Sequence, residues 1–335
     1  MKDYSNFKIA VVGATGVVGS VMLKVLEERG FGEAEVIVAA SERSIGKKIT
    51  FAGRELTLVS VADAIAAKPH YAIFSAGGSA SKQYAPQFAA VGTTVVDNSS
   101  AWRMDPDKPL VVPEINFDAI GPDSRIIANP NCSTIQMVLA VSQLHRRYGI
   151  KRLVISTYQS VTGTGIKAIR QLQTEERDET PIEKAYPYPI HRNLFPHGGD
   201  FLPDGYTTEE QKLVNETRKI LGDPEIGISA TVARVPVVGG HSESVNVELK
   251  EEFDLDEAVR IIGGTQGVEL YDDPANLRYP MPIMAEGRDE VFVGRIRRDP
   301  SQPCTLNLWV VADNLRKGAA TNAVQIVERL IESRR

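Results

Sequence analysis

The amino-acid sequence predicts an α/β fold, with a doubly wound parallel sheet in the first part of the chain and an α+β domain after it. Three observations support this. A length of 335 residues suits two domains. Short β-branched runs alternate with helix-period segments up to about residue 129, and beyond that point long strand-like runs follow one another.

The first part begins with a β-branched strand, Lys8–Val12, which leads through a glycine-rich turn into a helix-like stretch that Gly30 closes. Further strands are expected at Glu35–Ala40, Tyr71–Ser75 and Thr93–Asp97, with helices at 61–67 and 80–90. Alternation of this kind favours a parallel sheet with helices on both faces.

The pattern changes at Asn129-Pro130, where a proline precedes an amphipathic helix through Tyr148. We therefore expect a first domain at 1–129, a second at 130–315, and a C-terminal segment, 316–335, whose helix packs back on the first domain. The strands expected in the second domain are Lys151–Tyr158, Ala230–Val238, Ser244–Leu249, Val291–Arg298 and Thr305–Val311. The Pro- and Gly-rich stretch 186–205 is expected to be a long surface excursion.

Composition excludes several classes of protein. With 38 basic and 43 acidic side chains the net charge is -5, which provides no broad basic surface for nucleic acid or anionic lipid. The chain has 2 cysteines, far apart, which cannot form a disulfide framework or a four-ligand zinc site. The N-terminus lacks an apolar secretory core, and no long uncharged apolar run occurs. We expect a cytoplasmic protein without nucleic-acid or membrane partners and without a metal.

Gly13, Gly16 and Gly19 form a GxxGxxG motif between the first strand and the first helix. The first glycine suits a sharp turn, the second a close approach of backbone to a pyrophosphate, and the third close packing of the helix. Amides at the helix start bind anions. The motif therefore predicts a dinucleotide site, and a tight turn without a ligand is the alternative.

The second strand ends in Ser41-Glu42-Arg43-Ser44. In such sites a carboxylate here holds the ribose 2'-hydroxyl of NAD, whereas an arginine and hydroxyl groups receive the 2'-phosphate of NADP. Ser41, Arg43 and Ser44 therefore favour NADP, although Glu42 keeps NAD open. The alternative is a solvated loop of mixed charge.

Cys132 stands where a proline-delimited turn becomes a helix, and the positive partial charge of a helix N-terminus favours a thiolate. The residue is a candidate nucleophile. A small buried hydrophobic residue is the commoner fate of a lone cysteine, and that interpretation suits Cys304, which we expect inside the strand at Thr305–Val311.

A cysteine nucleophile needs a base, and 5 histidines compete for that role. His70, His145, His191 and His197 have ordinary solvated or packing interpretations. His241 follows Gly239-Gly240 in a permissive loop, close to Arg234. A structural role and a catalytic role for His241 remain equally open on this evidence.

Other candidate anchors are Gln159, at a strand end before a Thr-Gly turn, and Arg103, in a hydroxyl-rich loop beyond a strand. Glu209 and Lys212 lie three positions apart at the start of an expected helix. By themselves they suggest a surface ion pair.

Seven blocks of sequence resemble the aspartate-β-semialdehyde dehydrogenase family over the whole chain. They are GATGVVG at 13–19, SERSIGK at 41–47, NSSAWRMD at 98–105, NPNCST at 129–134, STYQSVTGTG at 156–165, RVPVVGGHSESVNVE at 234–248 and ADNLRKGAATNAVQI at 312–326. The resemblance implies a Rossmann-type NADP-binding domain, a catalytic and dimerisation domain, and a homodimer.

The resemblance also implies roles. Cys132 would form an acyl-thioester, His241 accept the proton, and Gln159 orient the substrate. Substrate contacts would be Arg234 on the α-carboxylate, Glu209 on the amine, and Arg103, Asn131 and Lys212 on phosphate. NADP contacts would be Thr15, Gly16, Val17, Val18, Arg43, Ser44, Thr162, Gly163 and Asn314.

The implied reaction joins aspartate semialdehyde, inorganic phosphate and NADP with 4-aspartyl phosphate and NADPH, and it serves lysine, threonine, methionine and isoleucine biosynthesis. Two alternatives are an N-acetyl-glutamyl-phosphate reductase, whose substrate has no free amine, and a catalytically silent NADP-binding relative. One departure stands at residues 190–200, IHRNLFPHGGD, where family members read something like IAFNVIPHID. We expect a changed subunit contact or loop there.

Overall fold

The computed structural model describes residues 4–333, which fall into two compact units. The first contains the chain up to Asn131 and again from Ala319, and the second contains Cys132–Gly318. The sequence analysis places the boundaries at 129/130 and 315/316. The chain returns to the first unit inside a short π-helix, Arg316–Ala320, which lies in the segment expected to begin the C-terminal helix.

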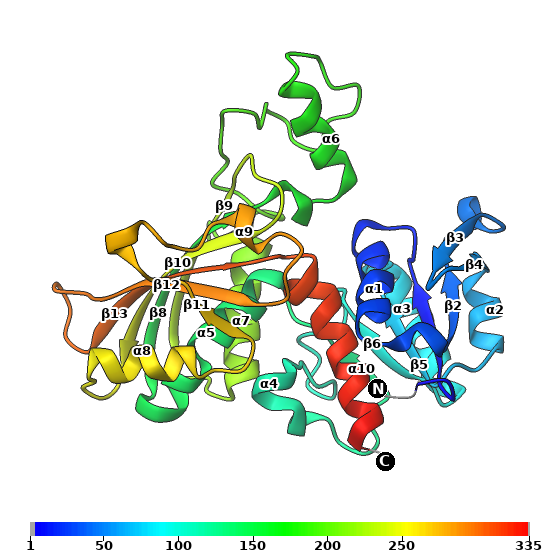
Figure 1. Cartoon of the computed structure of the whole chain (residues 1–335), viewed down its shortest axis with the longest axis horizontal. Coiled ribbons are helices and arrows are strands. Elements are labelled where there is room, and N and C mark those ends of the chain that lie inside the picture. Colours follow the sequence, from blue (N-terminus) through cyan, green and yellow to red (C-terminus); the bar gives the residue numbers. More distant parts are fainter. Residues whose placement is uncertain (1–3, 334–335) are drawn as a thin grey trace. The chain divides into compact units, whose positions relative to one another are not determined.

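The first unit is built on a parallel sheet of strand order β2-β1-β5-β6-β7 (Figure 1). Its strands are β1 (Lys8–Val12), β2 (Glu35–Ala39), β5 (Tyr71–Phe74), β6 (Thr94–Asp97) and β7 (Ile126–Ala128). The order reverses direction at β1, which pairs with both β2 and β5. In open sheets of this kind a ligand binds beyond the carboxyl ends of the strands at the reversal.

Helices cover both faces of this sheet, as expected. Buried residues of α1 and α10 pack with Ile9 and Val11, and buried residues of α2 and α3 pack with Ala10 and Val12. The helices are α1 (Val17–Glu28), α2 (Val61–Ala66), α3 (Gly78–Ala90), α4 (Pro113–Asn116) and α10 (Thr321–Ser333). The sequence analysis missed β7 and the hairpin β3 (Lys48–Phe51) and β4 (Arg54–Thr57), which are short segments without a strong period.

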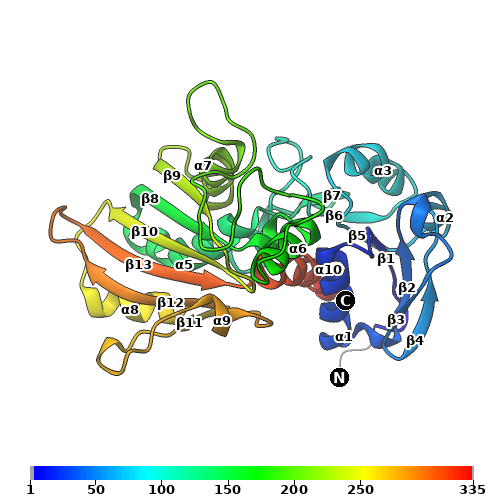
Figure 2. The ribbon, with the colours of Figure 1, turned by 90° about the horizontal axis from the view of Figure 1, so that it is seen from above.

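The second unit is built on a mixed sheet of order β11-β12-β13-β10-β8-β9, whose central strands lie side by side in Figure 2. Its strands are β8 (Ile150–Gln159), β9 (Gly227–Arg234), β10 (His241–Leu249), β11 (Val268–Leu270), β12 (Val291–Arg298) and β13 (Thr305–Ala312). Its helices are α5 (Cys132–Tyr148), α6 (Ile166–Glu175), α7 (Thr208–Leu221), α8 (Leu255–Gly263) and α9 (Pro282–Ala285).

One face of this second sheet is covered by α5, α7 and α8 (Figure 1). Alternate residues of β8 point to that covered face, and Leu153, Ile155, Thr157 and Gln159 are all buried. Tyr158, between the last two, is exposed on the other face. The covered face therefore carries both the core and the polar groups that end β8.

Two strand boundaries differ from expectation. β9 ends at Arg234 instead of running to Val238, and β10 begins at His241 instead of Ser244. His241 is therefore the first residue of a strand and fully buried, so the expectation of a permissive loop position was wrong. Local sequence is misleading here because Gly239-Gly240 suggests a longer loop, whereas pairing of His241 with Ala312 extends the strand.

Cys304 was also misplaced by the sequence analysis. It stands just before β13 with φ 52°, is only partly buried, and its Sγ donates to Glu252 Oε1 at 3.2 Å. It is not a small buried hydrophobic residue, because the turn that precedes the strand leaves its side chain beside a surface carboxylate.

The stretch between α6 and α7 contains no regular helix or strand among the described residues, which agrees with the expected excursion. Glu175 holds it through hydrogen bonds from the amides of Ile190 and His191, at 2.7 and 2.9 Å. Nowhere in residues 4–333 does a helix combine the length and the apolar character that a bilayer crossing requires.

Candidate active site

The glycine turn after β1 is shaped by close backbone contacts. Gly13 has φ +87°, and a Cβ there would lie 2.4 Å from the carbonyl oxygen of Ser75, after β5. A Cβ at Gly19 would lie 2.1 Å from the carbonyl oxygen of Gly13, so α1 rests directly on the turn. Only glycine fits at either position. Thr15, Gly16, Val17 and Val18 form the link into α1, with Gly16 as its N-cap.

A cavity of about 700 Å³ opens beside this turn. It is lined by Gly13, by Ser41, Glu42 and Arg43 at the end of β2, and by residues of α2 and α3 such as Tyr84. The structure thus brings together the glycine turn and the segment expected to select the cofactor. Ser44 follows in the same 3₁₀ turn without lining the cavity. A cation and a carboxylate both face the space.

Cys132 is the first residue of α5, at the helix end whose amides carry positive partial charge. Gly318 packs against it, and a Cβ at position 318 would lie 2.9 Å from Cβ of Cys132. The partly buried Cys132 therefore packs so closely against Gly318 that no side chain fits at position 318.

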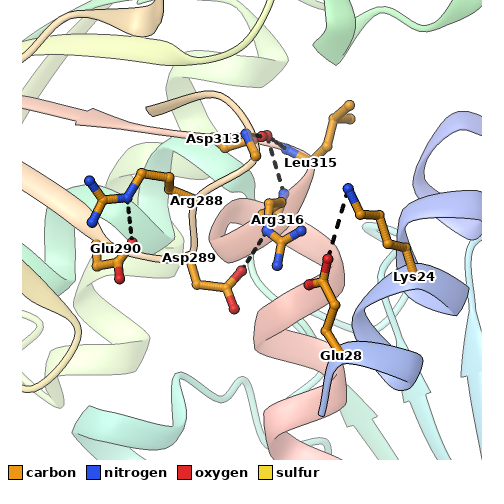
Figure 3. A network of polar contacts seen from close by, with 9 residues as sticks. Lys24, Glu28, Arg288, Asp289, Glu290, Asp313, Leu315 and Arg316 are labelled. Carbon is orange, nitrogen blue, oxygen red and sulfur yellow. Dashed lines mark hydrogen bonds and ion pairs between the residues drawn. The ribbon is translucent and has the colours of Figure 1, made fainter. Parts of the chain in front are cut away.

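The segment that carries Gly318 is fixed by a polar network (Figure 3). The Asp313 carboxylate accepts from the amides of Leu315 and Gly287, both at 2.8 Å. Arg316 Nε donates to Asp289 at 2.7 Å. These contacts hold the π-helix in place, and with it the residue that supports Cys132. The Lys24–Glu28 pair drawn in the same figure belongs to the first unit.

His241 is held from one side of its ring. The amide of Ser160 donates to Nδ1 at 3.0 Å, which places the proton of the neutral ring on Nε2. Nε2 has no hydrogen-bond partner within the described part of the chain. Burial, and next the positive charge of Arg234, lower the pKa of His241 to about 3, although Glu209 opposes the shift. His241 is therefore neutral at pH 7 in this structure and carries no positive charge that could stabilise a thiolate.

Arg234, the last residue of β9, is buried and donates from Nη1 to the carbonyl oxygen of Ser160 at 2.7 Å. Gly163 lies against the side chains of Arg234 and His241. A Cβ at position 163 would be 3.0 Å from Nη1 of Arg234 and 3.2 Å from Nε2 of His241. The structure thus brings Arg234, His241 and Gly163 together around Ser160, a residue that the sequence analysis did not single out.

Two further predicted residues are tied to this region. Gln159 Nε2 donates to Ser133 Oγ, next to Cys132, at 2.9 Å. Thr162 Oγ1 donates to Asn314 Oδ1 at 2.8 Å, so two expected cofactor contacts are hydrogen-bonded to each other. The sequence analysis gave Ser133 no role, and its place beside Cys132 was the only signal in the sequence.

Glu209 and Lys212 lie in the first turns of α7, and Lys212 Nζ is 2.7 Å from Glu209 Oε2. The side chains are only 12% and 31% exposed, so this is not the solvated surface pair that spacing alone suggests. Residues 190–200, where the chain departs from the family pattern, also lie close to Glu209 and to Arg234. A Cβ at Gly198 would be 3.4 Å from Cβ of Glu209, and Phe195 exchanges backbone hydrogen bonds with Arg234.

Arg103 and Asn131 belong to the first unit. Arg103 donates from Nε to the carbonyl oxygen of Asn129 at 2.9 Å and from Nη2 to that of Asn98 at 3.0 Å. Asn131 is buried and immediately precedes Cys132. Lys212, the third residue expected to bind phosphate, belongs to the second unit.

Comparison with known proteins agrees with both units. Residues 8–122 match the family model "Semialdehyde dehydrogenase, NAD binding domain", and residues 141–317 match "Semialdehyde dehydrogenase, dimerisation domain".

Curated relatives align over nearly the full chain. Aspartate-semialdehyde dehydrogenase of Aquifex aeolicus is 53% identical, with 98% of each chain covered. That of Legionella pneumophila is 48% identical, with 97% of this chain and 96% of the relative covered. The crystal structure of aspartate semialdehyde dehydrogenase II complexed with ASA from Vibrio cholerae has a TM-score of 0.93 at 43% identity, covering 97% of this chain and 98% of that one. With these matches over its whole length, a cysteine at a helix N-terminus and a glycine turn at the sheet reversal, the chain belongs to the aspartate-semialdehyde dehydrogenase family.

Proposed function

We propose that this protein catalyses the reversible reductive dephosphorylation of L-4-aspartyl phosphate to L-aspartate 4-semialdehyde with NADPH. The observation that carries the proposal is that one compact unit holds both Cys132, at the start of α5, and the buried His241, whose lowered pKa keeps it neutral at pH 7. The reaction would serve the biosynthesis of lysine, threonine, methionine and isoleucine in the cytoplasm.

Cys132 is the nucleophile of this proposal. Its thiolate adds to the carbonyl carbon of aspartyl phosphate, the C–O bond to phosphate breaks, and inorganic phosphate leaves behind an acyl-thioester. The helix N-terminus favours the thiolate. Packing against Gly318 fixes the position of Cys132. After reduction, the C–S bond of the thiohemiacetal breaks and releases the aldehyde.

His241 is proposed to donate a hydrogen bond to the substrate oxygen and to accept its proton. With its proton on Nε2, the ring donates a hydrogen bond to the substrate oxygen, on which negative charge develops as sulfur adds. A neutral ring is also able to accept the proton that the thiohemiacetal loses on collapse. Acceptance at Nε2 requires the other tautomer, which costs the hydrogen bond from Ser160. Gln159, held by Ser133, orients the same carbonyl group.

The ends of the substrate are assigned to charged side chains. Arg234 has donors beyond the one that bonds Ser160 and is proposed to bind the α-carboxylate in a bidentate manner. Glu209 is proposed to bind the amine. Arg103, Asn131 and Lys212 are proposed to bind the phosphate group. In the reverse direction, where phosphate is the nucleophile that attacks the thioester, this binding lets phosphate compete with water.

The cofactor site fits a dinucleotide because Gly13 and Gly19 allow the tight backbone turn at the start of α1, and Gly13 lines the cavity beside that turn. A bound nicotinamide would supply the hydride chemistry at the substrate carbon. Ser41, Arg43 and Ser44 are proposed to bind the 2'-phosphate of NADP. Thr162, Gly163 and Asn314 are proposed to contact the nicotinamide half.

A homodimer is proposed from the family description of the second domain and from exposed aromatic and apolar side chains on the sheet face opposite α5, part of which α9 covers. Tyr158 and Trp309 have ring centroids 5.4 Å apart on that face, and Tyr279 and Met281 are exposed as well. Apolar surface of this kind marks an interface. Light scattering after size exclusion gives the mass that checks the dimer.

The deciding experiment is phosphate-dependent NADPH formation from aspartate semialdehyde, with NAD as the parallel cofactor and Cys132→Ser as the control enzyme. We expect activity that needs both phosphate and Cys132 and that prefers NADP. Reduction assays with aspartyl phosphate and N-acetyl-glutamyl phosphate test the substrate. Full turnover by Cys132→Ser would refute the mechanism, and preference for the acetylated substrate would refute the assignment of Glu209.

A further inference from the structure

Glu243 is a buried carboxyl group that the proposed mechanism leaves unused. It lies in β10 two positions after His241, so both side chains point to the sheet face that α5 covers. Its exposed fraction is 0%. Thr157 is its neighbour across the β8–β10 pair and is buried too.

The surroundings of this carboxyl group contain no compensating charge. Neither oxygen has a hydrogen-bond partner of good geometry in the described chain, and the two α5 side chains within reach, Ser133 and Gln136, are uncharged hydrogen-bonding groups that lower the pKa of Glu243. Burial outweighs both and raises the pKa of Glu243 well above its usual value. An uncompensated buried carboxylate is strongly disfavoured, so the group takes up a proton instead.

The two neighbours on α5 lead to the proposed catalytic residues. Ser133 and Gln136 are three positions apart and so share one face of the helix. Ser133 Oγ accepts from Gln159 Nε2 at 2.9 Å. Gln136 Nε2 donates to the carbonyl oxygen of His241 at 3.3 Å, while its Oε1 is buried without a donor among residues 4–333.

A protonated carboxyl group supplies what these neighbours lack. A carboxylate only accepts hydrogen bonds, whereas a carboxylic acid also has one O–H donor. Gln136 Oε1 is an acceptor in need of a donor, because an unpaired buried polar atom carries a full desolvation penalty. Glu243 can satisfy Gln136 Oε1 only while it is neutral, because a carboxylate has no proton to donate.

We propose that Glu243 is kept as a neutral carboxylic acid and acts as a positioning residue, donating to Gln136 Oε1 and thereby fixing the backbone of His241 and the Ser133–Gln159 contact. The proposal rests on the catalytic roles assigned above to His241 and Gln159. Glu243 itself touches neither substrate nor cofactor in this scheme.

Three variants of the full-length enzyme test the proposal. Glu243→Gln stays neutral and keeps a donor, so kcat should remain within about threefold of the parent. Glu243→Leu keeps the bulk and loses the donor, so kcat should fall at least about tenfold with the KM for NADP nearly unchanged. Glu248→Leu is the matched control, since Glu248 is a buried carboxylate at the far end of the same strand, paired with Lys151 at 2.6 Å.

Stability separates positioning from a merely structural role. Replacing an uncompensated buried carboxyl by leucine should leave the Tm of Glu243→Leu equal or higher while kcat falls. Glu248→Leu should lower the Tm and leave kcat unchanged, because it breaks an ion pair. A parental kcat in Glu243→Leu would overturn the proposal, and so would a kcat in Glu243→Gln as low as that in Glu243→Leu.

One further measurement does not require that Glu243→Leu folds, and a second one separates the positioning role from the proposed catalytic site. The infrared difference between the parent and Glu243→Gln at pH 7 should contain a protonated-carboxyl band, and a carboxylate band instead would overturn the proposal. Gln159→Ala and His241→Ala should both lose activity. If they remain active, the proposed catalytic site fails, whereas inactive Gln159→Ala beside fully active Glu243→Leu refutes only the positioning role.

Discussion

Gly318 lies directly against Cys132, with so little space that a side-chain carbon at position 318 would be 2.9 Å from the cysteine Cβ. Asp313 and Asp289 fix the segment that carries this glycine. The position of the proposed nucleophile therefore depends on a residue 186 positions away in the sequence. Such a contact is fixed by tertiary packing alone.

Gly318→Ala should lower kcat at least about tenfold, because the added methyl group must displace Cys132 by overpacking. The rate of Cys132 alkylation in a Cys304→Ser background should change with it. Gly121→Ala is the control, since the nearest atom to a Cβ there is 3.8 Å away. A parental kcat in Gly318→Ala would show that this contact does not position the thiol.

Gly13→Ala should impair folding and cofactor binding more than backbone strain explains. The φ of +87° and the contact at 2.4 Å with Ser75 act together. Gly46→Ala isolates the strain, because Gly46 has φ +81° and nothing within 4 Å. The two variants are compared by urea unfolding and NADP titration. Equal losses of unfolding free energy in Gly13→Ala and Gly46→Ala would show that the close contact with Ser75 adds nothing to the effect of backbone strain.

The neutral state of His241 predicts a pH dependence of stability. Its pKa is about 3 when folded and about 6.5 when unfolded, so below pH 6.5 the unfolded chain binds the extra proton. The unfolding free energy should therefore fall by up to about 1.4 kcal/mol per pH unit between pH 6.5 and 3, and the contribution vanishes above that window. Arg234 and Glu209 are the charged groups that act on the ring.

Urea unfolding of the parent and of His241→Gln across this range checks the prediction. The stability difference between the two should drift in favour of the variant as pH falls. A constant difference would mean that His241 titrates normally in the folded protein.

Arg234→Leu should raise the KM for aspartate semialdehyde and cost about 2 to 5 kcal/mol in kcat/KM, because the substrate carboxylate loses a bidentate partner. The same change removes a positive charge that lowers the pKa of His241. Steady-state kinetics across pH separates the two effects. Unchanged kinetics would remove Arg234 from the site.

Lys212→Ala should raise the KM for phosphate with little change in the KM for the aldehyde. Lys212 also pairs with Glu209 at 2.7 Å, so a rise in the aldehyde KM alone would assign the lysine to holding Glu209 instead. Initial rates over a matrix of both substrate concentrations give the two constants.

Much of the fold and part of the site follow from local sequence. The alternation of strands and helices, the glycine turn and the helix that begins at Cys132 depend on side-chain period and turn chemistry within a few residues. Gly13 is therefore predictable as part of a dinucleotide site, and Cys132 as a candidate nucleophile, from the sequence alone. The carboxyl-end rule for parallel sheets also predicts that Ser41 and Arg43 lie near the glycines, and the cavity beside β1 agrees.

The rest was decided only by tertiary structure. His241 appeared to lie in a loop because Gly239-Gly240 precedes it, yet pairing with Ala312 makes it a buried strand residue. Its tautomer depends on the Ser160 amide, 81 positions away, and the neutral state that we propose for Glu243 depends on what α5 places over it. Turn and period preferences act over a few residues, whereas burial and electrostatic environment are set by whichever distant segments pack together.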